Sequence, residues 1–384
     1  MKVTVVVPRY GADVLGGAET QARGFAEEAA RRGWHVEVWT TCVRDHYTWR
    51  NAYAPGETVV EGVVVRRFPA ALVDTERHAA LSLRLARYGS LPLDDQYAWL
   101  ESGPHSPQLY AYAAHHAADV DVVVALPYLA PLVHYAAWAA GRRVVLWPCL
   151  HDEPYAYLEP VRLLMEGVWG VTFNAPEEGD LALQRLRIRP QRHAVLGEGV
   201  SLTTPTAAPV RPDTLLYVGR LEEGKNLDTL YRFVRRYADE GGALRLVVMG
   251  RGPWGPPRHP AFDARGFVSE TEKATAYASA LALCQPSLNE SFSLTVMESW
   301  LAGRPALVHA DCAVTVGHVR RSRGGLWFRT YDEFVAAVEW LQANPHLAER
   351  MGTNGRQYVQ ANYTWAAVVD RFEQLVERWG AADG

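Results

Sequence analysis

The stretch Glu290-Ser-Phe-Ser-Leu-Thr-Val-Met-Glu298 places two carboxylates eight residues apart and indicates how the second half of the chain folds. Residues 281–287 before it form an apolar run that ends in Pro-Ser, and residues 302–305 after it read Ala-Gly-Arg-Pro. This order predicts a buried strand, a loop that carries Glu290, and a helix that begins near Ser293 and ends before Pro305. Glu298 then lies inside the helix.

The start of this expected helix is suited to an anion. The first backbone amides of a helix have no acceptor within it, and here they face the loop that carries Glu290. A phosphate can lie against those amides while the two glutamates accept hydrogen bonds from hydroxyl groups. The pair therefore suggests a ligand with both phosphates and hydroxyls, for which a nucleotide-sugar is the candidate.

The same pattern extends through the rest of the second half. Residues 203–212 are rich in Pro, Thr and Ala and have the composition of a linker, after which strands alternate with helical periodicity. These expected strands cover residues 214–218, 244–249, 281–285 and 306–308.

The first half alternates in the same way. The pattern predicts a helix over residues 18–32, a hairpin over residues 58–68 and mostly helix over residues 72–118. The other expected strands cover residues 2–8, 35–41, 120–125, 143–147 and 170–174. The prediction is an α/β protein with two Rossmann-like, doubly wound domains that face an interdomain cleft.

In such sheets ligands bind beyond the carboxyl ends of the strands. The loops after Pro8, Gly219, Gly250 and Ser287, and the segment around His151, are therefore expected to form the site.

Composition narrows the class of protein. A chain of 384 residues, 48% of them hydrophobic, has material for two cores, and its net charge of −4 excludes nucleic acid as the main partner. Residues 1–7 are too short for the apolar region of a signal peptide and are expected to form a strand, and the longest apolar stretch, residues 122–140, is broken by prolines. A cytoplasmic protein is expected. The four cysteines have no metal-ligand spacing and are predicted to be buried thiols: Cys42, Cys149, Cys284 and Cys312.

Two cations lie in the loop Tyr217-Val-Gly-Arg-Leu-Glu-Glu-Gly-Lys-Asn226. Arg220 and Lys225 are expected at the mouth of the cleft, where they can neutralise a departing diphosphate in place of a metal ion. No metal or cofactor is therefore expected. Only Lys2, Lys225 and Lys273 are lysines among 39 basic residues, so a lysine in a candidate site carries extra weight. The alternative is a solvated loop with incidental charges.

In the first half, Gly16-Gly17 precedes a helix, so backbone amides can approach an anion or a sugar closely. The alternative is that these glycines only turn the chain. The segment His151-Asp-Glu-Pro154 follows a strand, and His151 is a candidate ligand of the substrate. A helix start with Asp152 as its cap explains the same residues, and both interpretations can hold together.

Together these motifs resemble the GT-B retaining glycosyltransferases, specifically glycosyltransferase family 4, the group 1 glycosyl transferases. The likeness covers essentially the whole chain in the expected order. It rests on Gly16-Gly17-Ala-Glu19, Gly219-Arg220-Leu with Lys225-Asn226, Gly266-Phe267-Val268, Pro286-Ser with Glu290-x7-Glu298, and Ala302-Gly-Arg-Pro305.

The resemblance implies a division of the chain into an acceptor-binding domain over residues 1–198, a nucleotide-sugar-binding domain over residues 199–362, and a last helix over residues 363–384 that packs back on the first domain. The implied activity is metal-independent transfer of a hexose-type sugar, with retention, from a nucleotide-diphosphate sugar to an acceptor hydroxyl in glycan, polysaccharide or glycolipid biosynthesis.

The resemblance also implies roles for single residues. In the reaction itself it implicates His151, Glu290, Arg220 and Lys225. The donor is expected to contact Gly17, Arg220, Lys225, Gly250, Phe267, Val268, Glu290, Ser293, Leu294 and, at its ribose, Glu298. The acceptor is expected to contact Gly16, Gly17, Glu19 and Asp152. The family often has Gly-Phe-Gly-Leu-Pro after the first glutamate, whereas this chain has Ser291-Phe-Ser-Leu-Thr295.

Other functions stay open at this stage. A GT-B nucleotide-sugar epimerase shares the diphosphate site, a phosphorylase needs a lysine for pyridoxal phosphate, and a non-catalytic nucleotide-sugar-binding protein needs neither. The acceptor can be a sugar, a lipid-linked molecule or a small molecule. Residues 76–87 predict an amphipathic helix, for which packing on its own domain is favoured and peripheral contact with the inner membrane face is the alternative. The oligomeric state is not predicted.

Overall fold

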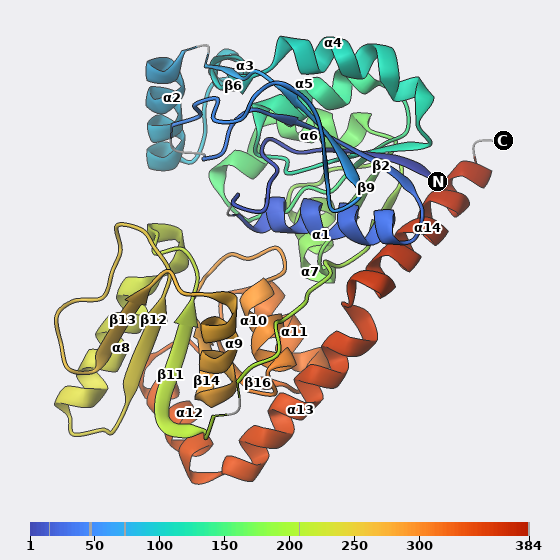
Figure 1. Ribbon diagram of the computed structural model, residues 1–384. Helices are drawn as coiled ribbons and strands as arrows, with labels where there is room; N and C mark the ends of the chain where they lie inside the picture. The colour runs from blue at the N-terminus through green and yellow to red at the C-terminus, as the bar shows by residue number, and fades with distance from the viewer. Residues whose placement is uncertain (15, 46–47, 73, 207, 383–384) are drawn as a thin grey trace. The chain divides into compact units, whose positions relative to one another are not determined.

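The computed structural model describes residues 1–14, 16–45, 48–72, 74–206 and 208–382. The chain forms two compact units, unit 1 (Met1–Gly199 with Trp365–Gly384) and unit 2 (Val200–Thr364) (Figure 1). Each unit is built on its own doubly wound sheet, so the predicted α/β fold class is confirmed.

Unit 1 contains an eight-stranded sheet in the order β10-β9-β8-β7-β1-β2-β4-β3. Its neighbouring strands are parallel except for β3 and β4, which form the hairpin predicted over residues 58–68. The strands are β1 (Lys2–Val6), β2 (His35–Thr41), β3 (Gly56–Val60), β4 (Val63–Phe68), β7 (Val122–Ala125), β8 (Val144–Leu146), β9 (Gly170–Phe173) and β10 (His193–Val195). Two short strands, β5 (Ala71–Leu72) and β6 (Pro104–His105), pair separately.

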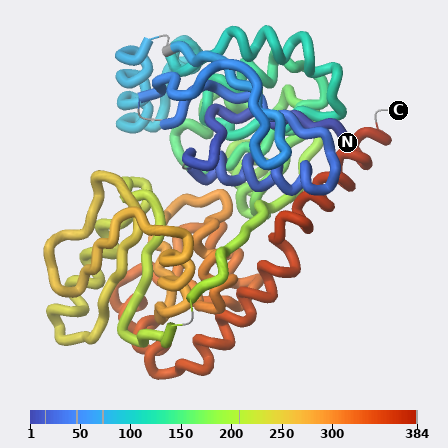
Figure 2. Tube along the Cα trace, viewed as in Figure 1, coloured from blue at the N-terminus to red at the C-terminus, as the bar shows by residue number. Residues whose placement is uncertain are grey.

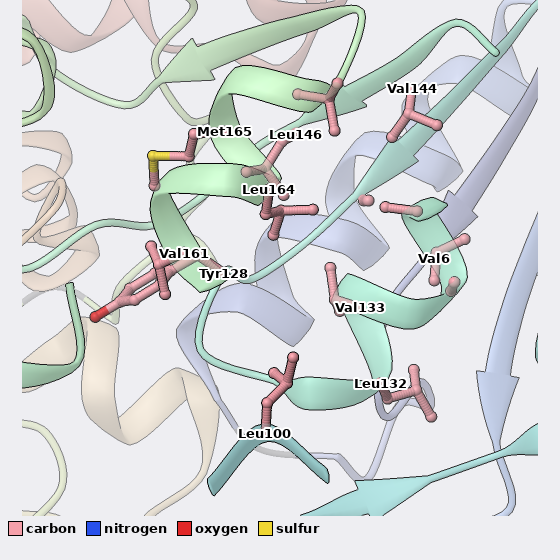
Figure 3. Close-up of a cluster of buried hydrophobic side chains, with 14 of the residues drawn as sticks. Val6, Leu100, Tyr128, Leu132, Val133, Val144, Leu146, Val161, Leu164 and Met165 are labelled. Atoms are coloured by element: carbon pink, nitrogen blue, oxygen red, sulfur yellow. The ribbon is translucent and has the colours of Figure 1, made fainter. Parts of the chain in front are cut away.

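Helices cover both faces of this sheet, so its central strands are buried on both sides. Their continuous valine-rich sequences fit this position. The helices are α1 (Gly17–Arg31), α2 (Thr75–Tyr88), α3 (Leu93–Ser102), α4 (Pro107–His116), α5 (Pro131–Ala140), α6 (Glu159–Gly167), α7 (Pro176–Asp180) and α14 (Trp365–Ala381). Figure 3 shows one core, in which Val133 of α5 and Leu164 of α6 lie with Leu146 of β8.

The last helix, α14, completes the opposite core of unit 1. Figures 1 and 2 both show α14 beside α1, and Phe372 of α14 meets Phe25 of α1 with ring centroids 4.9 Å apart. Trp365 lies where a side chain at Gly24 or Gly199 would stand, since a Cβ at either would come within 2.2 Å of its ring. The end of the chain is therefore an integral part of unit 1.

Unit 2 contains a six-stranded parallel sheet in the order β13-β12-β11-β14-β15-β16. Its strands are β11 (Arg211–Val218), β12 (Arg245–Met249), β13 (Phe262–Gly266), β14 (Ala280–Gln285), β15 (Ala306–His309) and β16 (Gly325–Phe328). Its helices are α8 (Leu227–Asp239), α9 (Glu270–Ser279), α10 (Leu294–Leu301), α11 (Ala313–Ser322), α12 (Tyr331–Ala343) and α13 (Pro345–Asn362). Ser269 and Glu272 form the capping box at the start of α9.

Both sheets run outward in two directions from their first strand. The direction reverses between β1 and β7 in unit 1 and between β11 and β14 in unit 2. Loops at the carboxyl ends of these strands flank the crevice in which open α/β sheets bind ligands.

Some local expectations need correction. Strands β5, β6, β10, β13 and β16 were not predicted, and β11 begins at Arg211, inside the expected linker. Asp152 does not cap a helix: Glu153 precedes a short 3-10 turn (Pro154–Tyr157), and no side chain caps that turn. In the part of the chain that the structure describes, no helix is both long and apolar enough to cross a membrane.

Candidate functional site

In unit 2 the loops that follow β11, β12 and β13 are joined at the carboxyl edge of the sheet. The Gly219 amide donates to the Met249 carbonyl at 3.0 Å, and the Gly250 amide donates to the Gly266 carbonyl at 2.8 Å. A Cβ at Gly250 would lie 1.8 Å from the Gly219 carbonyl oxygen. The close packing of the two loops therefore requires glycine at position 250.

The loop after β11 also reaches the loop after β14, across the point where the strand order reverses. The Asn226 side chain donates to the Pro286 carbonyl at 3.0 Å. Asn226 adopts a left-handed backbone conformation, with φ of 54°, that asparagine tolerates better than most residues. It thereby fixes the loop that carries Lys225 against the loop that carries Glu290.

Lys225 and Glu290 form an ion pair between these two loops. The Lys225 ammonium donates to Glu290 Oε1 at 2.7 Å, and the two side chains are 20% and 10% exposed. Arg220, in the same loop as Lys225, is 54% exposed and lies 3.1 Å from Glu222. Lys225 is thus held by Glu290, whereas the Arg220 side chain extends into solvent.

The expected helix after Glu290 is α10, and its first amides face the same edge. Ser293 precedes it with φ of 77° and ψ of 76°, in the left-handed region that favours glycine. The Gln285 amide holds this turn by donating to the Ser293 and Thr295 hydroxyls at 3.3 and 3.1 Å. The amide of Leu294, at the first helical position, has no acceptor within the helix and is available to an anion.

Glu298 lies one helical turn further on and is held by α9. Its Oε1 accepts from Lys273 at 2.9 Å, and its Oε2 accepts from the Tyr277 hydroxyl at 2.8 Å. Both lysines of unit 2 therefore pair with the two glutamates of the motif, Lys225 with Glu290 and Lys273 with Glu298.

An exposed aromatic ring stands at the end of β13. Phe267 is 53% exposed, and the guanidinium of Arg251, after β12, lies over its ring at 5.2 Å. Val268 next to it is half-buried and packs into the core. Such a ring offers a flat apolar face on which a nucleobase can stack.

In unit 1 some of the predicted site residues are buried and paired within the protein, whereas others are accessible to a ligand. Glu19 is buried, and its Oε1 pairs with the Arg9 guanidinium at 2.5 Å. A Cβ at Gly16 would lie 2.0 Å from Glu19 Oε2, so this internal ion pair explains the glycine. A Cβ at Gly17 meets no atom within 4 Å, so packing within the protein does not require Gly17.

His151 follows β8 and is partly exposed. Its Nδ1 lies 3.9 Å from Glu153, whose carboxylate accepts from the Tyr128 hydroxyl at 2.7 Å. Asp152 binds the Tyr157 hydroxyl at 2.8 Å and the Arg185 guanidinium, so its carboxylate already has two internal partners.

A buried polar network supports the loop that carries His151. Glu178 of α7 accepts from the Leu150 amide at 2.5 Å and from the Asn174 amide, and burial raises its pKa to about 8. Gln21 of α1 donates to Asn174 at 2.9 Å and accepts from the Cys149 thiol at 3.1 Å. The loops after β8 and β9 are thereby joined to the first turns of α1.

Sequence reasoning assigned no role to Lys273, Tyr277, Arg251, Arg9 or Glu178. Only the rarity of lysine in the chain could have singled out Lys273. Within the described residues, no group of three or more His, Cys, Asp or Glu side chains is placed to hold a metal ion. Cys42, Cys284 and Cys312 are buried thiols, as predicted, whereas Cys149 is half-buried, and all four are free.

Comparison with known proteins finds a family match within unit 2. Residues 212–344 match the family described as glycosyl transferases group 1. A D-inositol 3-phosphate glycosyltransferase of Streptomyces bingchenggensis is 27% identical over 239 residues, which are 53% of this chain and 52% of that protein. The match thus spans about half the length of that relative. One of the same name from Kribbella flavida is 23% identical over 389 residues, 91% of this chain and 88% of that protein.

Solved structures share the fold across the whole chain. A sucrose-phosphate synthase from Thermosynechococcus elongatus aligns with a TM-score of 0.75 and 19% identity, covering 99% of each chain. Anabaena HepE in complex with UDP and glucose aligns with a TM-score of 0.70 and 13% identity, covering 98% of this chain and 100% of HepE.

Proposed function

We propose that the protein transfers a sugar from a nucleoside-diphosphate donor to an acceptor hydroxyl, because residues 212–344 match the group 1 glycosyltransferases and the fold is of the GT-B type. The observation that carries the proposal is the convergence at one edge of unit 2 of the Lys225–Glu290 ion pair, the open amides of α10, and Glu298. We assign the reaction to glycan, polysaccharide or glycolipid biosynthesis.

The donor diphosphate binds, in this proposal, between the start of α10 and the two cations of the loop after β11. The Ser293 and Leu294 amides donate to phosphate oxygens, and Lys225 and Arg220 balance their charge. The reaction then needs no metal ion, because two positive charges, Lys225 held by Glu290 and Arg220 from the same loop, stabilise the leaving group. Glu290, which orients Lys225 at 2.7 Å, also accepts from a hydroxyl of the transferred sugar.

The remaining parts of the donor lie along the same edge. Glu298 accepts from the ribose hydroxyls, and Phe267 with Val268 receives the base. Anabaena HepE, which shares the fold, was solved in complex with UDP and glucose, so UDP-glucose is the first donor to test. The two relatives described above are named D-inositol 3-phosphate glycosyltransferases, which makes inositol 3-phosphate the first acceptor to test.

We propose a hexosyl transfer with retention. The bond between the anomeric carbon and the phosphate oxygen breaks, and the acceptor oxygen forms its bond to that carbon on the same face. The acceptor proton passes to the leaving phosphate oxygen, so no enzyme nucleophile is required. His151 contacts the reacting sugar, and the open position at Gly17 admits donor or acceptor close to the backbone of α1.

The direct test is release of nucleoside diphosphate. The purified protein is mixed with UDP-, GDP- and ADP-sugars, with and without inositol 3-phosphate and simple sugar acceptors. Acceptor-dependent release supports the transferase. Epimerised donor without an acceptor identifies an epimerase, and binding without turnover identifies a binding protein. If the protein neither binds nor turns over any of these donors, the proposal is wrong.

Membrane contact is a separate part of the proposal and rests on α2. Leu81 and Leu85 of this helix are buried in unit 1, whereas Leu83 and Tyr88 are 71% and 66% exposed beside arginines. We propose that this exposed face rests on anionic lipid when the acceptor is lipid-linked. Flotation with vesicles that contain anionic phospholipid tests it, and a protein that stays at the bottom of the gradient disproves it.

A further inference from the structure

Lys273 is a lysine to which the proposed reaction assigns no role. It lies on α9, and its side chain is 18% exposed. Its ammonium donates to Glu298 Oε1 at 2.9 Å and lies 2.8 Å from Glu270 Oε2. Elsewhere the chain almost always uses arginine as its cation, which makes a lysine in this position informative.

Glu298 is not fully shielded from solvent. Its side chain is 13% exposed, so the residue is largely but not completely buried. Each oxygen of a carboxylate has two acceptor positions, and Lys273 and Tyr277 use one position on each oxygen. Two positions remain, one per oxygen, which is what a pair of neighbouring hydroxyl groups requires.

The charge of this carboxylate depends on its neighbours. Burial raises the pKa of Glu298, and the Lys273 ammonium and the Tyr277 hydroxyl oppose that rise. Glu270 also raises the pKa, so the titratable groups that act on Glu298 all come from α9. Without Lys273, a buried carboxyl at this position would tend to bind a proton.

We infer that Lys273 is a positioning residue that keeps Glu298 ionised and aimed at the vicinal hydroxyls of the donor's ribose. The inference rests on the proposed function for the identity of the ligand. It deepens that function by assigning the ribose site to a pair, in which Glu298 contacts the nucleotide and Lys273 acts through Glu298. The pair also predicts a preference for ribonucleotides over 2′-deoxyribonucleotides.

Two variants separate the charge of Lys273 from its hydrogen bonding. Lys273→Arg keeps the positive charge, whereas Lys273→Gln keeps a donor without the charge. The first measurement is the titration of the Glu298 carboxyl carbon by NMR on protein labelled at glutamate, with Glu298→Gln identifying the signal. We expect the midpoint to rise in Lys273→Gln and to stay close to that of the unaltered protein in Lys273→Arg.

This titration uses no ligand, so it decides the charge role of Lys273 whether or not the protein is a transferase. Equal midpoints in all three proteins would overturn the inference. Lys273→Gln can lose stability, because it removes the partner of an enclosed charge. Thermal melting therefore accompanies each titration, and Lys273→Arg carries the same side-chain bulk as a check on folding.

The second measurement is calorimetric binding of UDP. At neutral pH we expect Lys273→Gln to bind UDP about tenfold more weakly, the loss typical of a charge-assisted hydrogen bond. Affinity should recover as the pH rises, because Glu298 becomes ionised again. Lys273→Arg should bind within about threefold of the unaltered protein. The loss in Lys273→Gln should be smaller for 2′-deoxy-UDP, which keeps only the 3′-hydroxyl. A merely structural role for Lys273 would weaken binding equally at every pH.

Glu270→Gln is the matched control. It removes the other partner of Lys273 and leaves the bond to Glu298 in place. UDP affinity and its pH dependence should stay within about twofold of the unaltered protein. If Glu270→Gln reproduces the pH dependence of Lys273→Gln, the effect arises from helix α9 and the inference fails. If the unaltered protein binds no nucleoside diphosphate, the proposed function fails while the titration still gives its own answer.

Discussion

The two sheets share one strand arrangement around the point where their order reverses, but they use polar side chains at that edge in opposite ways. In unit 2, Arg220 and Phe267 are about half exposed, and Lys225 is 20% exposed. In unit 1, Gln21, Asn174 and Glu178 are at most 1% exposed. Unit 2 therefore exposes charged side chains at this edge, whereas these polar groups of unit 1 hold the shape of its loops.

The order of the strands therefore fixes where a binding site can form, but it does not fix which ligand that site binds. Backbone topology sets where loops meet, and side chains decide whether that place binds an anion or a neutral molecule. In the proposed function, unit 2 binds the charged diphosphate, and the hydroxyl-bearing acceptor approaches Gly17 and His151 of unit 1.

The largest effect is expected at the buried carboxyl of unit 1. The pKa of Glu178 is raised to about 8 by burial, so this group binds a proton in the folded state and releases it on unfolding near neutral pH. Stability gained this way is present at low pH and is lost as the pH rises toward about 8. Relative to Glu178→Gln, the native protein should lose up to about 4 kcal/mol between about pH 5 and pH 8, at ~1.4 kcal/mol per pKa unit.

Urea unfolding at several pH values measures this difference, with Glu177→Gln as the neighbouring control. Parallel pH profiles for the native protein and Glu178→Gln would mean that Glu178 is ionised in place. The buried network of unit 1 would then resemble the charged edge of unit 2, and the contrast would weaken.

The next effect concerns the ion pair of unit 2. Lys225→Ala should weaken binding of UDP and UDP-glucose by about 100-fold, because it removes a charge-assisted bond to the diphosphate and leaves Glu290 without that partner. Isothermal titration calorimetry measures it. Lys2→Ala, a lysine at the surface of unit 1, serves as the control. Unchanged affinity in Lys225→Ala would show that the diphosphate assignment is wrong.

Two adjacent glycines of unit 1 should respond differently. Gly16→Ala places a Cβ against Glu19 at a φ of 154°, and should cost about 1–3 kcal/mol of stability. Gly17→Ala meets no atom and should change stability by less than about 1 kcal/mol. If a substrate approaches Gly17, its variant should still lose roughly tenfold or more in sugar transfer. Full activity in Gly17→Ala would remove Gly17 from the site.

The smallest effect is expected at the exposed ring of unit 2. Phe267→Ala should weaken UDP binding by about tenfold, since base–aromatic stacking contributes roughly 1–3 kcal/mol. Phe267→Tyr should retain affinity. Trp327→Ala, at another ring that is 44% exposed, is the control. Equal losses in Phe267→Ala and Trp327→Ala would point to general destabilisation instead of stacking.

The sequence predicted the fold class well because apolar periodicity is local. Residues 281–285 and 58–68 were recognisable as a strand and a hairpin from a few neighbours. Strand β13 was missed since Phe-Asp-Ala-Arg-Gly has no apolar run, as suits its position at the edge of the sheet. The Asp152 cap was wrong because the carboxylate binds Tyr157 and Arg185 instead.

The candidate site was predictable only in part for a related reason. The spacing of Glu290 and Glu298 is visible in the chain, whereas their lysine partners lie 65 and 25 residues away. Such pairings depend on where β11, α9 and α10 meet in space. The strained turn at Ser293 was equally hidden, because serine is rare in a left-handed conformation.

The position of α14 has a consequence for synthesis of the protein. Unit 2 is one continuous segment, Val200–Thr364, so all of its residues are synthesised before α14. Unit 1 must wait for Trp365 and Phe372 to cover the valine-rich face beside α1. Unit 1 can therefore complete its core only after unit 2 has been synthesised, and until then the apolar face beside α1 stays exposed, which favours aggregation. Removal of residues 365–381 would therefore destabilise unit 1, although these residues follow unit 2 in the sequence.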